Sequence, residues 1–235
     1  MFVNPVCVLC GTPVDAGADG FCRACREDLP PLPSAMCPGC GAQSEYAAVC
    51  VRCLAKPPAF DVCIAAYSYH YPVDRMIRKL KYQARLDLAR ALSGPLIELL
   101  EPARRAPPEC LLPIPLHRAR QRRRGFNQAR EIALLLARTL AVPVDEQLVH
   151  RHKPTAQQFD LRPEHRARNV KDAFSLVKTM SYKHIAIIDD VLTTGATANE
   201  LARLLKANGA EQVQVWCLAR AIKYPNSAPS GRELR

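Results

Sequence analysis

The sequence predicts an α/β fold, in which a parallel sheet is flanked by helices and a small cysteine-rich module precedes it. Three observations predict this fold. Strand-length apolar runs alternate with amphipathic helical segments, as in parallel sheets covered on both faces. Eight cysteines fall in the first 53 residues as CxxC pairs. The apolar run at 184–188 ends on two adjacent aspartates, followed by a hydroxyl-rich turn and a helix.

The cysteine pairs have the spacing of two zinc sites. They follow C-x2-C-x11-C-x2-C and then C-x2-C-x9-C-x2-C. Two thiolates three positions apart can hold one tetrahedral ion at about 2.3 Å, and a second pair completes the site. Gly11 and Gly41, each directly after a pair, allow the tight turn of a zinc knuckle. The candidate ligands are Cys7, Cys10, Cys22, Cys25, Cys37, Cys40, Cys50 and Cys53.

A disulfide framework is the alternative, but it needs an oxidising compartment to which nothing in the sequence directs the chain. Four cysteines leave no open position for water, so both zinc sites are expected to be structural. The segment has few large apolar side chains, and we expect it to need metal for folding. Sequential and crossed pairing of the knuckles both stay open. Cys63, Cys110 and Cys217 lie in apolar surroundings and are expected in the core.

The remaining elements follow from periodicity. Residues 61–72 alternate with period two and predict a strand. The segment 73–101 has helical spacing, and Gly94-Pro95 is expected to break or bend it. Further strands are expected at 109–117, 184–188 and 212–219, helices at 126–141 and 197–210, and a polar stretch of little periodicity at 151–169.

Length and composition limit the class of protein. With 235 residues, of which 49% are hydrophobic, the chain can form one sizeable core and an accessory module. We expect a zinc module at 1–57, a main domain at 58–223 and a disordered tail at 224–235. No apolar run reaches the roughly 20 residues of a membrane-spanning helix, and the N-terminus lacks the pattern of a secretory signal. A cytoplasmic protein with no membrane partner is expected.

The segment AIIDDVLTTGAT, at 186–197, combines the features of a sugar-phosphate site. Ligands of an open parallel sheet bind beyond the carboxyl ends of the strands, where Asp189 and Asp190 are expected. The turn after them offers hydroxyls, a glycine and the N–H groups of a helix N-terminus, which favour an anion. This combination matches a ribose 5-phosphate. A magnesium-binding strand of a nucleotide triphosphatase is the weaker alternative, because the chain has no Gly-Lys dipeptide.

This segment resembles the phosphoribosyl pyrophosphate signature of type I phosphoribosyltransferases. The segments LLPIPLHRARQRRRGFNQA, KPTAQQFDLRPEHRARNVKDAF and IRKLKYQARLDLARAL, behind a double zinc ribbon, are similar to the ComF/GntX family. The resemblance covers nearly the whole chain. It implies a type I phosphoribosyltransferase-like sheet, phosphoribosyl pyrophosphate and Mg²⁺ as ligands, and a role in DNA uptake during natural transformation.

The resemblance also implies roles for particular residues. Asp189 and Asp190 would bind the ribose 2′- and 3′-hydroxyls as the catalytic pair. The turn after them would hold the 5′-phosphate, the loop after the strand at 110–115 would face the pyrophosphate, and a mobile loop would close over the site. The residues are Thr193, Thr194, Gly195, Ala196 and Thr197 for the 5′-phosphate; Pro115, Leu116, His117, Arg124 and Lys81 for the pyrophosphate; and Lys153, Thr155 and Gln158 for the mobile loop.

The expected reaction displaces pyrophosphate from the anomeric carbon through a cation-like sugar, and it needs no protein nucleophile. Mg²⁺ bound to the pyrophosphate would neutralise the leaving group, and the carboxylates would ease the positive charge on the ring. Loop closure would keep water from the reactive carbon. The acceptor and the oligomeric state do not follow from the sequence.

The run HRARQRRRGF, at 117–126, concentrates basic side chains in a chain whose net charge is +11. A charge run is most often a solvated face. The alternative is binding of polyphosphate or single-stranded DNA, where each neutralised phosphate adds affinity. Two functions therefore compete: a phosphoribosyltransferase, and a DNA-handling module that uses the pocket as a ligand sensor. The candidate nucleic-acid contacts are Arg118, Arg120, Arg122 and Arg123.

Overall fold

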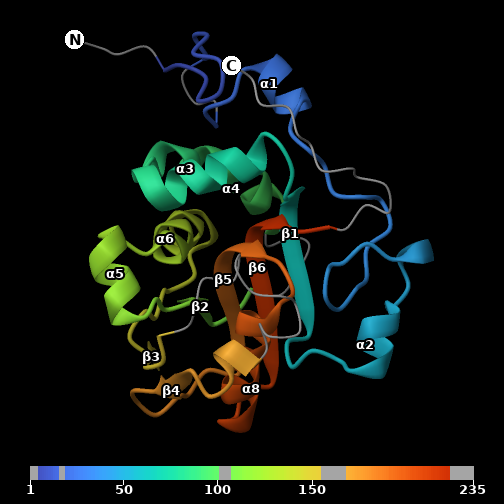
Figure 1. Ribbon diagram of the computed structural model, residues 1–235, viewed down its shortest axis with the longest axis vertical. Coiled ribbons are helices and arrows are strands. Elements are labelled where there is room, and N and C mark those ends of the chain that lie inside the picture. Colours follow the sequence, from blue (N-terminus) through green and yellow to red (C-terminus); the bar gives the residue numbers. More distant parts are fainter. Residues whose placement is uncertain (1–4, 16–18, 101–106, 155–167, 223–235) are drawn as a thin grey trace.

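The computed structural model describes residues 5–15, 19–100, 107–154 and 168–222 (Figure 1). It confirms the parallel α/β sheet, whose four strands have the order β1-β6-β5-β2. A separate antiparallel pair is formed by β3 and β4. The strands are β1 (Val62–Ser68), β2 (Cys110–Pro113), β3 (Val149–Arg151), β4 (Phe174–Leu176), β5 (His184–Leu192) and β6 (Gln212–Arg220).

Helices cover both faces of the sheet, so alternate residues of the central strands are buried on opposite sides. Ala186 and Ile188 of β5 pack in one core cluster, and Ile185 and Ile187 pack in the other. The first cluster lies under α3, α4 and α6, and the second lies under α8. The helices are α3 (Val73–Gln83), α4 (Leu86–Leu100), α6 (Gln128–Leu140) and α8 (Ala196–Ala207).

The expected break at Gly94-Pro95 is wrong, because α4 continues through both residues. The interruption falls at Ala84, which has a left-handed φ of 52° and separates α3 from α4. Gly94 is needed for a contact: a Cβ at this position would lie 3.2 Å from the Cβ of Asp19. The glycine therefore marks the place where the N-terminal module approaches the helix.

The first cysteine module, residues 7–25, lies against α4. A Cβ at Gly20 would lie 3.2 Å from the Cβ of Ala91, so this contact requires glycine as well. Arg26, in helix α1 (Arg23–Glu27), forms ion pairs with Asp19 and with Glu98 of α4. The Arg26 side chain is 43% exposed. Phe21, which is 3% exposed, also packs in the core cluster under α3, α4 and α6. The first module is thus held by one buried aromatic side chain, by close contacts at glycines and by a solvated ion-pair cluster.

The second cysteine module, residues 37–53, packs at the ends of β1 and β6. It contains the short helices η1 (Glu45–Ala47) and α2 (Val51–Ala55). A Cβ at Gly41 would lie 3.1 Å from Sγ of Cys63 in β1. Arg220, the last residue of β6, donates through Nε to the carbonyl oxygen of Cys40 at 3.1 Å. Cys40 and Cys53 belong to the same buried cluster as the residues under α8.

The other cysteines confirm the core prediction, since Cys110 and Cys217 are fully buried and Cys63 is half-buried. The boundary at residue 57 stays a prediction, and the tail at 224–235 lies outside the described residues. Among the residues that the structure describes, no helix is both long enough and apolar enough to cross a bilayer.

Candidate functional site

A cavity of about 120 Å³ lies where the carboxyl ends of β2 and β5 meet α3 and α6. This is the edge at which parallel α/β sheets bind ligands. Ile114, Leu116 and Ala129 give it an apolar wall, and its polar residues come from segments far apart in the sequence. The charged lining residues are Lys81, Arg120, Arg124, Arg151, Asp189 and Asp190.

An ion pair occupies the floor of the cavity. Asp190 is 3% exposed, and its Oδ2 lies 2.9 Å from Nζ of Lys81. Burial opposes the charged form of Lys81, but the carboxylate of Asp190 outweighs it and raises the pKa of Lys81 above its ordinary value. Lys81 therefore stays charged at neutral pH and fixes one of the two carboxylates.

Asp189 has a different electrostatic setting. Burial and then the neighbouring charge of Asp190 raise its pKa to about 7, although Lys81 acts in the opposite direction. Its Oδ1 accepts a hydrogen bond of 2.9 Å from the backbone N–H of Asp190. Asp189 thus changes between a hydrogen-bond acceptor and a proton carrier close to neutral pH.

The turn after β5 leads directly into α8. Gly195 has φ of 77°, a left-handed conformation that favours glycine, and α8 begins at Ala196. Thr193 and Thr197 line the cavity beside the aspartates. Thr194, Gly195 and Ala196 line an adjacent cavity of about 350 Å³, which also contacts the second cysteine module. The turn therefore lies between the two cavities.

The arginine run forms helix α5 (Arg118–Arg124), and its residues divide between two faces. Arg120 and Arg124, one turn apart, line the cavity. Arg124 donates from Nη1 to Oε1 of Gln128 at 2.6 Å, and its guanidinium lies 5.4 Å from the ring centre of Tyr82. The exposed members of the run are Arg118, Arg122 and Arg123.

Of the other predicted contacts, some line the cavity and some do not. Leu116 lines it, but Pro115 and His117 are not among its lining residues. Nδ1 of His117 accepts from the N–H of Ala119 at 3.3 Å and so caps α5. Lys153 donates from Nζ to the carbonyl oxygen of Lys171 at 3.0 Å. Thr155 and Gln158 lie outside the described residues.

Sequence reasoning missed Arg151, which ends β3 and lines the cavity. It is 4% exposed, and its guanidinium lies 5.4 Å from the ring centre of Phe174 in β4. Burial and the charge of Arg120 lower the pKa of Arg151 to about 10, so it remains cationic. It lies in a polar stretch without a motif, and only its place after the apolar pair Leu148 and Val149 hinted at a buried position.

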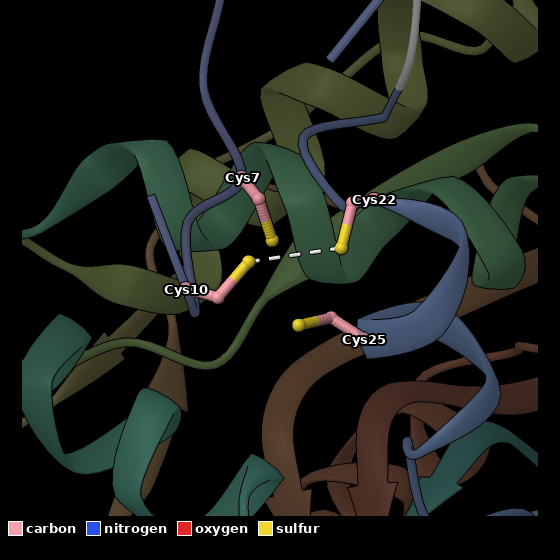
Figure 2. A group of neighbouring side chains, drawn as sticks. All are labelled: Cys7, Cys10, Cys22 and Cys25. Carbon is pink, nitrogen blue, oxygen red and sulfur yellow. Dashed lines mark hydrogen bonds between the residues drawn. The ribbon is translucent and has the colours of Figure 1, made fainter. Parts of the chain in front are cut away.

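The structure brings the eight predicted cysteines together as two groups of four whose geometry fits a metal ion. In each group, sequential pairs come together, with all four sulfur atoms within 4.8 Å of one another. Figure 2 shows the side chains of the first group pointing toward a common centre. The Sγ–Sγ distance is 3.7 Å for Cys10–Cys22 and for Cys40–Cys50. Tetrahedral zinc with bonds of about 2.3 Å requires roughly 3.8 Å between sulfurs, so the residues fit zinc.

Comparisons with known proteins agree with both parts of the chain. The double zinc ribbon domain matches residues 1–54, and the phosphoribosyl transferase domain matches residues 123–229. The DNA utilization protein YhgH of Escherichia coli (strain K12) is 37% identical over 225 residues, covering 94% of this chain and 99% of the relative.

Two further relatives carry competence names. Competence protein F of Haemophilus influenzae is 35% identical over 228 residues, covering 94% of this chain and 99% of that protein. Competence protein ComFC of Bacillus subtilis is 26% identical, covering 85% of this chain and 84% of that protein. A purine phosphoribosyltransferase from Pyrococcus horikoshii superposes with a TM-score of 0.33 and 14% identity, over 66% of this chain and 96% of that one.

Proposed function

The chain belongs to the ComF/GntX family, and from this premise we propose that it is a phosphoribosyltransferase that binds phosphoribosyl pyrophosphate. One observation carries the proposal: the aspartate pair and two threonines of the following turn line the same cavity as four cationic side chains. Acceptors for a diol, hydroxyls for a phosphate and cations for a pyrophosphate are thereby brought together.

Each group has a task in the transfer. Asp189, in its ionised form, accepts hydrogen bonds from the ribose hydroxyls, while Asp190 is held in place by Lys81. Arg120, Arg124 and Arg151 attract the pyrophosphate and stabilise it as it leaves. The bond between C1 and the pyrophosphate oxygen breaks, a bond from C1 to the acceptor nitrogen forms, and that nitrogen loses its proton.

Mg²⁺ bound with the pyrophosphate would supply further neutralisation of the leaving group. Carboxylate and phosphate oxygens are the ligands that Mg²⁺ prefers, and the carboxylate of Asp189 on the cavity floor fits this requirement. The positive charge that develops on the sugar ring is eased by the same carboxylates, as in glycoside cleavage.

Calorimetric titration with phosphoribosyl pyrophosphate and Mg²⁺ tests binding. Asp189→Ala is expected to abolish measurable binding, because it removes the acceptor for the diol. Glu146→Gln is a matched control, since this carboxylate pairs with Arg130 outside the cavity. Unchanged binding in Asp189→Ala would remove the site assignment. Pyrophosphate release with free bases or single-stranded DNA as candidate acceptors tests turnover. Binding without release would favour a ligand sensor.

DNA handling is a second candidate function, favoured by the exposed part of the arginine run. Arg118, Arg122 and Arg123 face solvent beside the cavity, and relatives are named for DNA utilization and competence. Single-stranded oligonucleotide binding should fall steeply with salt, and the slope should flatten in an Arg122→Ala, Arg123→Ala variant. A slope that is flat in the unmodified protein would count against this function.

A further inference from the structure

Arg220 lies between the phosphate turn and the second cysteine module. It is 2% exposed, and its Nη1 lies 2.8 Å from the carbonyl oxygen of Leu192 and 2.5 Å from that of Thr193. Its Nε donates at 3.1 Å to the carbonyl oxygen of Cys40, a metal-ligating residue of the second module. One guanidinium therefore connects the end of β5 with the backbone of a zinc knuckle.

These contacts determine how the turn presents its N–H groups. In a trans peptide, the carbonyl and the following N–H point in opposite directions. Because the carbonyls of Leu192 and Thr193 point to Arg220, the N–H groups of Thr193 and Thr194 point away from it. The buried cation thus orients two potential phosphate donors and adds positive charge beneath the turn.

The second module holds the other side of this connection firmly. Gly41 directly follows Cys40 and approaches Cys63 so closely that an added Cβ would lie 3.1 Å from its Sγ. Cys40 is itself 2% exposed and packs in the core cluster under α8. A zinc ion that fixes Cys40 would therefore fix the carbonyl to which Arg220 donates.

We propose that Arg220 is a positioning residue that couples the second zinc site to the sugar-phosphate pocket. Zinc at the second site orders the Cys40 carbonyl, Arg220 transmits that order to the Leu192–Thr193 peptides, and the turn binds the 5-phosphate more tightly. By linkage, the sugar phosphate also strengthens zinc retention at this site. The inference rests on the proposed function, because it requires that the pocket bind a ribose 5-phosphate.

The test is a double-mutant cycle with ribose 5-phosphate as the calorimetric probe. Arg220→Met and Cys50→Ser, which removes a ligand of the second zinc, are each expected to weaken binding about tenfold, as the loss of a charge-assisted hydrogen bond does. The double variant is expected to bind no more weakly than the weaker single variant, because both changes interrupt the same connection. Additive losses, or unchanged binding in Arg220→Met, would overturn the proposal.

Controls separate positioning from general damage. Arg26→Met removes the arginine that ties the first module to α4 through ion pairs, and it is expected to leave ribose 5-phosphate affinity unchanged. Arg220→Lys keeps the charge without the fork and should recover part of the affinity, which also covers the case in which Arg220→Met does not fold. In a zinc-release assay with a chromophoric indicator, saturating ribose 5-phosphate should slow release from the second site in the unmodified protein, and it should slow release less in Arg220→Lys.

Failure of the two proposals is distinguishable. If the unmodified protein does not bind ribose 5-phosphate, the proposed function and the coupling are both wrong. If the unmodified protein binds it and Arg220→Met and Arg220→Lys bind it equally well, the proposed function survives and only the role of Arg220 is wrong.

Discussion

The two cysteine modules have nearly the same ligand spacing, yet they join the rest of the molecule in different ways. The first packs Phe21 into the core cluster under α3, α4 and α6, and it contacts α4 through close glycine contacts and the solvated ion pairs of Arg26. The second packs into the core cluster under α8 and is joined to the turn after β5 through buried Arg220. Two modules with nearly the same metal motif are therefore placed differently: among the described residues, the second module shares buried contacts with the turn after β5 and the first does not.

The exposure of the ligands follows the same division. In the first module Cys7 is buried, Cys22 and Cys25 are half-buried, and Cys10 is exposed. In the second module Cys37, Cys40 and Cys53 are buried, and Cys50 is half-buried. A metal ion in the second module would thus be shielded by the protein core, and its loss would disturb buried residues that pack under α8.

Removing the fourth ligand of each site should give the largest difference. Cys53→Ala is expected to lose one zinc and lower the unfolding temperature by about 10 °C or more, since structural zinc is worth roughly 10 kcal/mol of folding free energy. Like Cys50→Ser, it should weaken ribose 5-phosphate binding about tenfold. Cys25→Ala should lose one zinc and keep the binding. Metal analysis, thermal unfolding and calorimetry measure these effects. Equal loss of binding in both variants would contradict the division.

The knuckle glycines provide a matched pair of smaller size. Gly11 and Gly41 have φ of 77° and 60°, so alanine is strained at both by about 1 kcal/mol. Nothing lies within 4 Å of a Cβ at Gly11, whereas at Gly41 it would meet Cys63. Gly41→Ala should therefore cost a further 1–3 kcal/mol or so. Denaturant unfolding would measure the difference, and equal costs would show that the second knuckle can move away.

The pH dependence of the pocket should be independent of the first module. The raised pKa of Asp189, about 7, means that its carboxylate is the acceptor above this pH and is protonated below it. Affinity for ribose 5-phosphate should thus be full near pH 8 and fall about tenfold by pH 6. Calorimetry should give the same profile in Cys25→Ala. Asp189→Asn should lack this titration, and an unaltered profile in that variant would assign it to the ligand's own phosphate.

The smallest effect is expected for the ion pairs of the first module. Arg26→Ala removes contacts to Asp19 and Glu98, but the arginine is 43% exposed, and such pairs contribute at most about 1 kcal/mol. The unfolding temperature should fall by roughly 2–4 °C, with zinc content and pocket affinity unchanged. A loss of ribose 5-phosphate affinity in this variant would indicate that the first module also influences binding in the pocket.

Local patterns were sufficient for the elements and the metal groups. Ligand spacing predicted both cysteine clusters, and the apolar run before Asp189 predicted the central strand. Patterns of this kind record periodicity within a segment. They contain no information on which distant segments meet, and for that reason Arg151, from a polar stretch, was missed although it lines the cavity.

The errors and omissions at other residues have the same origin. Gly94 looked like a helix breaker, but its absent side chain serves a contact with Asp19, some 75 positions away in the sequence. Arg120 was expected among the nucleic-acid contacts, and only the helical geometry of α5 shows that it lines the cavity together with Arg124. The carbonyl partners of Arg220 are backbone groups, which no residue-type motif can reveal.

The ion pair between Lys81 and Asp190 affects how an anionic ligand would bind in the cavity. Asp190, the more buried of the two acids, already has its counterion, so an anionic ligand would meet a compensated carboxylate and not an unpaired one. Long-range attraction would come from Arg120 and Arg124, and the buried pair would affect only how the bound ligand is aligned. Attraction of the ligand and its alignment would thereby depend on different charged groups.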